Sequence, residues 1–430
     1  MDAQPRKILI CTYGTRGDVE PFLALAKGLR VAGCDVLLAT SERFEEFALQ
    51  HGVPFYPMSD ESLAAIETPD GRAMMEGGAG LIRRMMAGIR LARRSGPISA
   101  ELMRQVWSAA RSFGPDAIIF HSKLFAASHV AEKLRIPAFL GALQPMIVPT
   151  SAFPAMGLPS LSLPRFNQLT YRLVNASFGA LRKSVNRFRD QSLGMPPIKD
   201  VRSVLFPPGA GVIPVLHAHS PSVMARPQDW PPHAHVTGTW RLPSLEEFSP
   251  PQELVTFLED GPPPVFVGFG SMTSTDGKAL GRLVSGALRK AGQRGVVAQG
   301  WADLDVDGGA DIIAIPPVPY SWLFPRMAAV VHHGGAGTTA EGFHAGVPCL
   351  ICPFFGDQPG WGRLSADLGV GAQPIKRSRL TEERLAKGIA QITGSADLRA
   401  NAKSLAEKLA REDGVQSAVD IVMRNWARRD

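Results

Sequence analysis

Short apolar runs along the first third of the chain alternate with segments in which apolar residues recur at helical spacing. The first run, KILICTYG, is typical of a strand buried on both faces. The segment after it places apolar side chains on one helical face at Phe22, Leu25, Ala26 and Leu29. Pro21 suits the first turn of that helix and Gly33 its end. Strands that alternate with helices predict right-handed βαβ units and a parallel sheet covered on both faces.

Two proline-rich segments interrupt this alternation. Residues 144–210 combine proline and serine with apolar side chains, which fits either the wall of a ligand pocket or a packed irregular loop. The prolines of residues 226–263 indicate an interdomain linker. A second strand and helix series starts at PVFVGFGS. We therefore predict an α/β protein with two doubly wound, Rossmann-like domains facing an interdomain cleft. The predicted parts are an N-terminal domain at 1–232, a linker at 233–262, a C-terminal domain at 263–412 and a terminal helix at 413–430. We expect that helix to pack back on the N-terminal domain.

Length and composition fit a globular chain of two domains. The 430 residues, 45% of them hydrophobic, can bury two cores. No apolar run approaches the ~20 residues that span a bilayer, and the start has no signal-peptide pattern, so we expect a cytoplasmic protein. The four cysteines are too few for a disulfide framework, which agrees with a reducing compartment.

Basic residues are concentrated in the first half of the chain. Residues 1–232 hold 26 Lys+Arg against 18 Asp+Glu, a balance of +8, so the rest of the +7 chain carries −1. Residues 81–94 contain five arginines and no acid, with apolar and basic side chains on neighbouring helical stripes. Such a helix can contact the inner membrane surface peripherally, or it can be a solvated helix whose apolar stripe faces the core. Nucleic acid is not an expected partner, because no recognition motif or interleaved aromatic residues accompany the arginines.

The sequence HHGGAGTT, residues 332–339, follows one apolar run and precedes a helix-like segment. Its glycines let the backbone approach an anion closely, and the free N–H groups of a helix start favour negative charge, so a diphosphate is the expected ligand. Neighbouring residues of a strand point to opposite faces, so His332 and His333 are poorly placed to share a metal ion. We predict no metal site and expect one histidine to face the core and the other the ligand.

Two further segments carry candidate chemistry. The CxxC spacing of CLIC, residues 349–352, lies inside an apolar run and has no partner pair, so buried structural cysteines are expected there. Asp357 and Gln358 follow this run, where they can hydrogen-bond the hydroxyls of a sugar or start a helix. In GTRGDVEP, residues 14–21, Asp18 can accept a proton from a hydroxyl or cap the helix near Pro21.

GTRGDVEP and the long stretch at 319–358 make the chain resemble the UDP-glycosyltransferases of the GT-B fold, closest to the sterol glucosyltransferases and the glycopeptide-antibiotic glycosyltransferases. The resemblance in element order extends over essentially the whole chain. It implies an inverting, metal-independent transfer of a hexosyl group, with glucose expected, from a UDP-sugar to a hydroxyl of a hydrophobic acceptor such as a sterol, terpenoid, polyketide or lipid. The UDP-sugar is a co-substrate and no cofactor is implied. The acceptor would bind in 1–232 and the nucleotide sugar in 263–412.

The resemblance also implies roles for individual residues. The donor-binding positions are the following: Ser271, His333, Gly335, Gly337 and Thr338 near the diphosphate, Glu341 on the ribose, Asp357 and Gln358 on the sugar, and the backbone of Val318 at the base, with Gly14, Thr15 and Arg16 forming a phosphate-proximal loop. The plant enzymes stack a tryptophan on uracil just before Val318, where this chain has Pro317, so Trp322 or Trp301 would have to replace it.

Asp18 and His121 are the expected catalytic residues. Many family members have the two residue types exchanged, whereas the sterol and antibiotic branches resemble this chain. We expect Asp18 to be the general base, with its pKa raised by an apolar surrounding, and His121 to orient it or relay its proton. Two alternatives remain: a sugar-nucleotide epimerase of the same fold, and a non-catalytic lipid- or nucleotide-binding relative.

Overall fold

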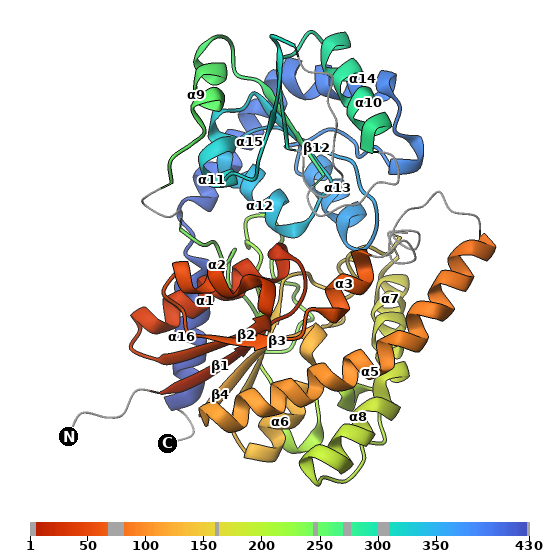
Figure 1. Cartoon of the computed structure of the whole chain (residues 1–430), viewed down its shortest axis with the longest axis vertical. Coiled ribbons are helices and arrows are strands. Elements are labelled where there is room, and N and C mark those ends of the chain that lie inside the picture. Colours follow the sequence, from red (N-terminus) through yellow and green to blue (C-terminus); the bar gives the residue numbers. More distant parts are fainter. Residues whose placement is uncertain are drawn as a thin grey trace. The chain divides into compact units, whose positions relative to one another are not determined.

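A computed structural model describes residues 6–67, 81–159, 163–243, 248–269, 277–298 and 309–427, without the side chains of 65–67, 81–96 and 427. The chain forms two compact units (Figure 1). The first comprises Met1–Ala65, Arg90–Pro243 and Glu412–Asp430, and the second comprises Ile66–Ile89 and Ser244–Arg411. Within the described residues, no helix is long and apolar enough to cross a membrane.

The first unit is built on a parallel sheet of seven strands. Their order across the sheet is β3 (Phe55–Met58), β2 (Asp35–Ser41), β1 (Lys7–Cys11), β4 (Ala117–His121), β5 (Ala138–Ala142), β6 (Val215–His217) and β7 (Ala234–Val236). Strand β1 pairs with β2 on one side and with β4 on the other. The chain therefore adds β2 and β3 on one side of β1 and then crosses back to add β4 to β7 on the other side. The gap between β1 and β4 is therefore the topological switch point, where ligands bind in open α/β sheets.

Helices from both ends of the chain cover one face of this sheet. Helix α1 (Arg16–Val31) lies beside α16 (Gly414–Ala427) in Figure 1, and both contribute to one apolar cluster with the strands. The two helices approach closely at Gly28, because a Cβ there would lie 2.3 Å from Cγ1 of Val415. The remaining helices up to residue 188 are α2 (Glu45–Gln50), α3 (Glu61–Glu67), α5 (Leu81–Phe113), α6 (Ala126–Leu134), α7 (Pro164–Ser177) and α8 (Arg182–Phe188).

Three features of this unit differ from the sequence prediction. Helix α1 begins at Arg16 rather than near Pro21, because the side chains of Thr15 and Asp18 form a capping box there. The irregular region 144–210 contains helices α7 and α8. Strand β7 lies inside the segment predicted as linker, where strands of three residues between prolines give no recognisable period.

The second unit has a parallel sheet of five strands. Their order is β10 (Ile312–Ile315), β9 (Gly295–Ala298), β8 (Val265–Gly268), β11 (Ala329–His332) and β12 (Cys349–Ile351). Its switch point lies between β8 and β11, which pair in parallel. The helices are α9 (Gln252–Glu259), α10 (Gly277–Lys290), α11 (Tyr320–Leu323), α12 (Ala336–Ala345), α13 (Gln358–Asp367), α14 (Glu382–Gly394) and α15 (Ala396–Leu409). Cys349 and Cys352 are free and fully buried, as expected for structural cysteines.

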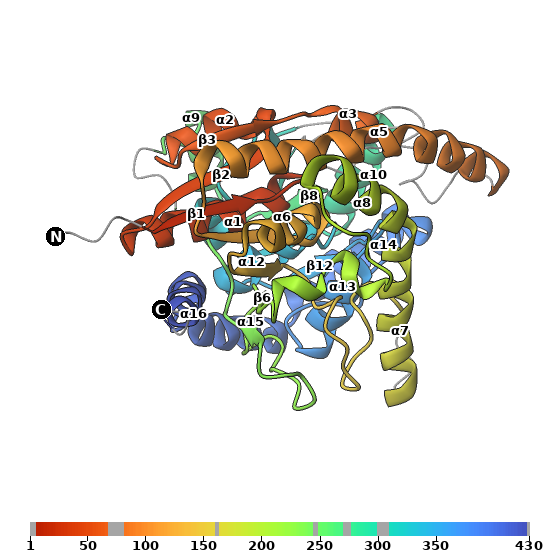
Figure 2. The same cartoon turned by 90° about the horizontal axis from the view of Figure 1, so that it is seen from below.

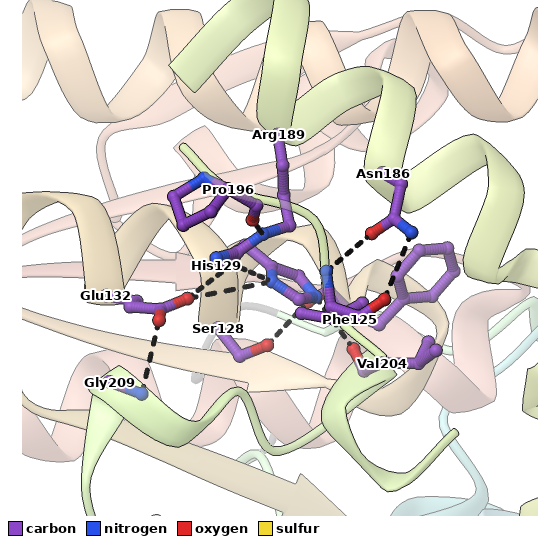
Figure 3. A network of polar contacts seen from close by, with 10 residues as sticks. Phe125, Ser128, His129, Glu132, Asn186, Arg189, Pro196, Val204 and Gly209 are labelled. Atoms are coloured by element: carbon purple, nitrogen blue, oxygen red, sulfur yellow. Dashed lines mark hydrogen bonds and ion pairs between the residues drawn. The ribbon is translucent and has the colours of Figure 1, made fainter. Parts of the chain in front are cut away.

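A buried polar network ties the region after residue 177 to helix α6 (Figure 3). Arg189 forms an ion pair with Glu132, donates to the carbonyl of Pro196 at 2.7 Å and lies 2.9 Å from Nδ1 of His129. The other ring nitrogen of His129, Nε2, lies 3.0 Å from the carbonyl of Val204. Because arginine is always a donor and a carbonyl always an acceptor, His129 is neutral and carries its proton on Nε2.

Buried neutral histidines should make the protein less stable as the pH falls. Burial lowers the pKa of His129 to about 4 from the ordinary 6.5. The unfolded chain therefore binds a proton below pH 6.5 that the folded chain does not, and stability is lost from there down to about pH 4. Each such histidine should lower the free energy of unfolding by about 2 kcal/mol between pH 7 and pH 5.

Denaturant unfolding at the two pH values measures this loss. His129→Gln, whose amide can accept from Arg189 and donate to Val204, should have a smaller difference between the two pH values than the parent protein. An identical difference in both proteins would contradict the assignment of His129.

Candidate functional site

The first candidate site lies at the switch point of the seven-stranded sheet. Asp18 is in the first turn of α1, after β1, and Lys123 follows the end of β4. Because β1 and β4 are neighbours, the two side chains meet: Nζ of Lys123 lies 2.8 Å from Oδ1 of Asp18. The backbone N–H of Thr15 donates to the other oxygen, Oδ2, at 2.8 Å. The carboxylate is therefore held from two sides in one orientation.

Gly14 leaves the room that this ion pair needs. Its φ of +142° is one that other residues rarely adopt, and a Cβ at this position would lie 2.1 Å from Oδ2 of Asp18 and 2.8 Å from Nζ of Lys123. Any larger residue at position 14 would displace the carboxylate or the ammonium group.

The pKa of Asp18 differs from the sequence expectation. Burial raises it, but the ammonium group of Lys123, the neighbouring His121 and hydrogen bonds from Lys123 and Thr15 outweigh burial, and the net pKa lies below the ordinary 3.8. The rise in pKa was expected because burial removes water from the carboxylate, whereas the cation beside it lowers the pKa. Asp18 is thus ionised throughout the physiological range.

His121 ends β4 and is buried beneath this pair. Its ring packs edge-on against Phe22 at a centroid distance of 5.6 Å. Burial lowers its pKa to about 4, so the ring is neutral near pH 7. Among the described residues, Nδ1 of His121 has no hydrogen-bond partner, and no hydrogen bond joins the ring to Asp18. Lys123, rather than His121, is the residue in contact with the Asp18 carboxylate.

Thr15 and Arg16 lie at the start of α1. Thr15 is the N-cap, and its hydroxyl lies 3.3 Å from Oδ2 of Asp18. Arg16 turns to the helix surface, where its Nε lies 2.6 Å from Glu20 and its guanidinium group covers the ring of Phe47 at 4.6 Å. In this structure the backbone of the loop, not the Arg16 side chain, surrounds the carboxylate.

A second candidate site, in the other unit, is the turn between β11 and α12. His332 is fully buried, and its Nδ1 accepts from the N–H of Gly334 at 3.1 Å. His333 is half-buried and lies over the turn, because a Cβ on Gly335 would meet its Nε2 at 2.5 Å. The alternation of strand side chains predicts this division. Burial lowers the pKa of His333 to about 4, so a neutral imidazole faces the turn near pH 7.

The N-terminus of α12 can bind an anion. Its N-cap is Gly335, so no side chain caps the helix. The first helical bond runs from the N–H of Thr339 to the carbonyl of Gly335, and the preceding N–H groups of the first turn have no acceptor within the helix. Nothing lies within 4 Å of a Cβ added at Gly337. N–H groups at a helix start that have no acceptor within the helix can bind a phosphate, and Gly337 adds no side chain to this turn.

Helix α13 begins beside this turn. A Cβ on Gly334 would lie 3.2 Å from the carbonyl oxygen of Gln358. The side-chain oxygen of Gln358 accepts from the N–H groups of Phe354 and Phe355 at 2.8 and 3.1 Å, which shapes the preceding loop. Oδ2 of Asp357 accepts from the indole N–H of buried Trp361 at 2.8 Å. Asp357 and Gln358 are thus held in place next to the glycine turn.

The other donor positions are less closely defined. Glu341 is half-buried on α12, within the same helix as Gly337 and Thr338. Val318 is half-buried between β10 and α11. Trp322 packs under the guanidinium group of Arg326 and against Phe248. Ser271 and Trp301 lie outside the described residues.

Two residues of these sites, Lys123 and Trp361, were not predicted from the sequence. Lys123 lies two positions after His121, so its place just beyond a strand end was the available signal. Trp361 lies four positions after Asp357, which places both on one face of a helix.

Comparison with known families and proteins agrees with this geometry. Residues 8–150 match the model of the glycosyltransferase family 28 N-terminal domain, and residues 308–423 match that of the erythromycin biosynthesis protein CIII-like C-terminal domain. Two sterol 3-beta-glucosyltransferases of Arabidopsis thaliana are each 34% identical: UGT80A2 over 98% of this chain and 66% of its own length, and UGT80B1 over 97% and 68%. A sterol 3-beta-glucosyltransferase of Penicillium rubens is 33% identical over 98% of this chain. This chain thus spans about two thirds of the plant relatives and 30% of the fungal one.

Solved structures support the fold. The glycosyltransferase of kitacinnamycin superposes with a TM-score of 0.70 over 98% of both chains at 16% identity. The calicheamicin glycosyltransferase CalG4 gives 0.69 over 99% of both chains at 17% identity. The two parallel α/β sheets are therefore those of the GT-B fold, and the chain belongs to the glycosyltransferase family that contains the sterol 3-beta-glucosyltransferases.

Proposed function

We propose that this protein transfers a hexosyl group, glucose above all, from a UDP-sugar to a hydroxyl of a hydrophobic acceptor and inverts the anomeric centre. The observation that carries the proposal is the uncapped start of α12 at a glycine turn beside His333, in a chain of this family. The relatives named sterol 3-beta-glucosyltransferases support a hydrophobic acceptor such as a sterol. The glycosyltransferase VinC, which has a similar fold, was crystallised with dTDP. The screen described below therefore includes both UDP- and dTDP-sugars.

The second unit supplies what the leaving group needs. Displacement at the anomeric carbon breaks the bond to the diphosphate, which leaves with the additional negative charge. The free N–H groups at the start of α12 and one N–H of the neutral His333 ring can stabilise that charge. In this proposal Asp357, held by Trp361, and Gln358, held by the Phe354 N–H, hydrogen-bond the sugar hydroxyls.

The first unit supplies the base. As the acceptor oxygen bonds to the anomeric carbon, its proton passes to the Asp18 carboxylate. Lys123 keeps that carboxylate ionised before the reaction, and Thr15 fixes its direction. His121, buried and neutral near pH 7, is the residue proposed to orient Asp18 or relay its proton. We propose segments 55–110 and 144–190 as the apolar acceptor wall and the cytoplasm as the compartment, which fits four unpaired cysteines.

A donor and acceptor screen read by mass spectrometry tests this function. The purified protein is incubated with UDP- or dTDP-sugars and a panel of sterols, terpenoids, polyketides and hydroxylated lipids. The expected product is an acceptor heavier by one hexosyl group, formed in the same amount as free nucleotide diphosphate. Release of UDP without a glycoside, or conversion of the UDP-sugar to its epimer, would contradict the proposal.

Removing the cation beside Asp18 should shift the pH profile. Lys123 lowers the pKa of Asp18, so Lys123→Met should raise that pKa and activity should be lost at a higher pH on acidification. The acid limb of the kcat/KM profile should move to higher pH by about one unit. This is the lower end of the shift that a neighbouring cation causes, because half of the Lys123 side chain is exposed to solvent. Lys123→Arg keeps the charge and should retain the parent profile. A profile unchanged in Lys123→Met would show that the ion pair does not control the base.

A further inference from the structure

Helix α7 (Pro164–Ser177) buries two polar side chains and exposes leucines to solvent. Its buried residues are Asn167, Thr170 and Tyr171. The amide of Asn167 donates to the carbonyl of Ser151 at 2.9 Å, and the hydroxyl of Thr170 accepts from the N–H of Ala155 at 2.8 Å. The inward face thus holds the preceding loop by these hydrogen bonds, beside the fully buried ring of Tyr171.

Leucines occupy the outward face. Leu169 is 45% exposed and Leu173 is 59% exposed, and Leu163, just before the helix, is 58% exposed. Leu169 and Leu173 are spaced i, i+4, so they lie side by side on the helix. Figure 2 shows α7 at the periphery of its unit. Large apolar side chains gathered on one exposed face mark a surface that contacts something other than water.

Arginines flank these leucines on the same face. Arg165 and Arg172 are exposed, and with Leu169 they are spaced i, i+4, i+7. Neither arginine forms an ion pair with any of the described residues. Between residues 163 and 189 the chain has six lysine and arginine residues and no acid. The surface is therefore apolar along its centre and cationic at its margins.

We infer that the outward face of α7, formed by Arg165, Leu169, Arg172 and Leu173, docks on an anionic lipid bilayer. The leucines would enter the interface between headgroups and acyl chains, and the arginines would remain with the phosphates, because their apolar stems let the charged ends reach water. This surface includes none of the residues assigned to catalysis and donor binding, and it is the exposed side of a helix whose segment, 144–190, is proposed above as part of the acceptor wall. The basic segment 81–94 is helical within α5, but its side chains lie outside the described residues and carry no part of this inference.

Sedimentation with vesicles tests the inference. The full chain should bind vesicles of phosphatidylcholine mixed with phosphatidylglycerol more strongly than vesicles of phosphatidylcholine alone, and added salt should weaken the binding. Leu169→Ser combined with Leu173→Ser should lower the partition coefficient at least about tenfold. Arg165→Gln and Arg172→Gln should each lower it about fivefold. All these positions are exposed, so an unchanged thermal unfolding profile checks that the variants fold.

Two controls keep the result specific. Leu49→Ser removes another exposed leucine, 55% accessible on α2, and should leave vesicle binding unchanged. Arg83→Gln combined with Arg90→Gln tests segment 81–94 separately. The inference is overturned if the parent protein binds no vesicles, if binding is lost only in the 81–94 variant, or if the α7 variants change the oligomeric state and leave vesicle binding intact.

Discussion

Asp18→Asn is expected to reduce kcat by about a thousandfold, the contribution of a well-placed general base. The amide has the shape of the carboxylate and can still accept the hydrogen bond from the Thr15 N–H, so helix α1 should keep its start. It cannot accept a proton from the acceptor hydroxyl at neutral pH. Steady-state kinetics at saturating donor and acceptor measure the loss, and calorimetric titration with UDP should give an affinity close to that of the parent.

Two comparisons separate the loss of the base from a disturbed site. Lys123→Met removes the partner of Asp18 but leaves the carboxylate, so it should retain much of the parent kcat at a pH above its shifted acid limb. Turnover in Asp18→Asn within tenfold of the parent would exclude Asp18 as the base. A matching loss of UDP affinity would place the effect of Asp18 on donor binding instead.

The fold was predictable where strands and helices have clear periods. The two series of apolar runs became two parallel sheets, and the helix predicted from Phe22, Leu25, Ala26 and Leu29 is α1, in which all four are buried. Strands β6 and β7 were not predicted, because three-residue strands between prolines are recognised only by pairing with a neighbour distant in sequence. Helices α7 and α8 show a further limit, because residues 144–210 gave no helical prediction between their prolines, whereas the structure forms helices there.

The site was predictable as a set of residue types but not as a set of contacts. The turn was predicted from its glycines, and the different surroundings of His332 and His333 from the alternation of side chains at the end of a strand. The pKa of Asp18 was expected to rise, but it is lowered. The first of the lowering causes is Lys123, which lies 105 positions later in the chain. Which cation meets a buried carboxylate depends on strand order, and the pairing of β1 with β4 across the switch point brings these two together.

His333→Ala is expected to weaken donor binding by about ten- to a hundredfold, because a hydrogen bond to a charged group contributes about 1.5–3 kcal/mol. The ring lies over the glycine turn, so its loss leaves the diphosphate with the N–H groups of α12 alone. His332, one position earlier, is the matched control. It is fully buried, and its Nδ1 holds the N–H of Gly334. His332→Asn can keep that bond and should change stability more than donor affinity. Calorimetric titration with UDP and denaturant unfolding of both variants separate the two roles, and equal losses of UDP affinity would mean that both histidines support the turn and neither contacts the donor.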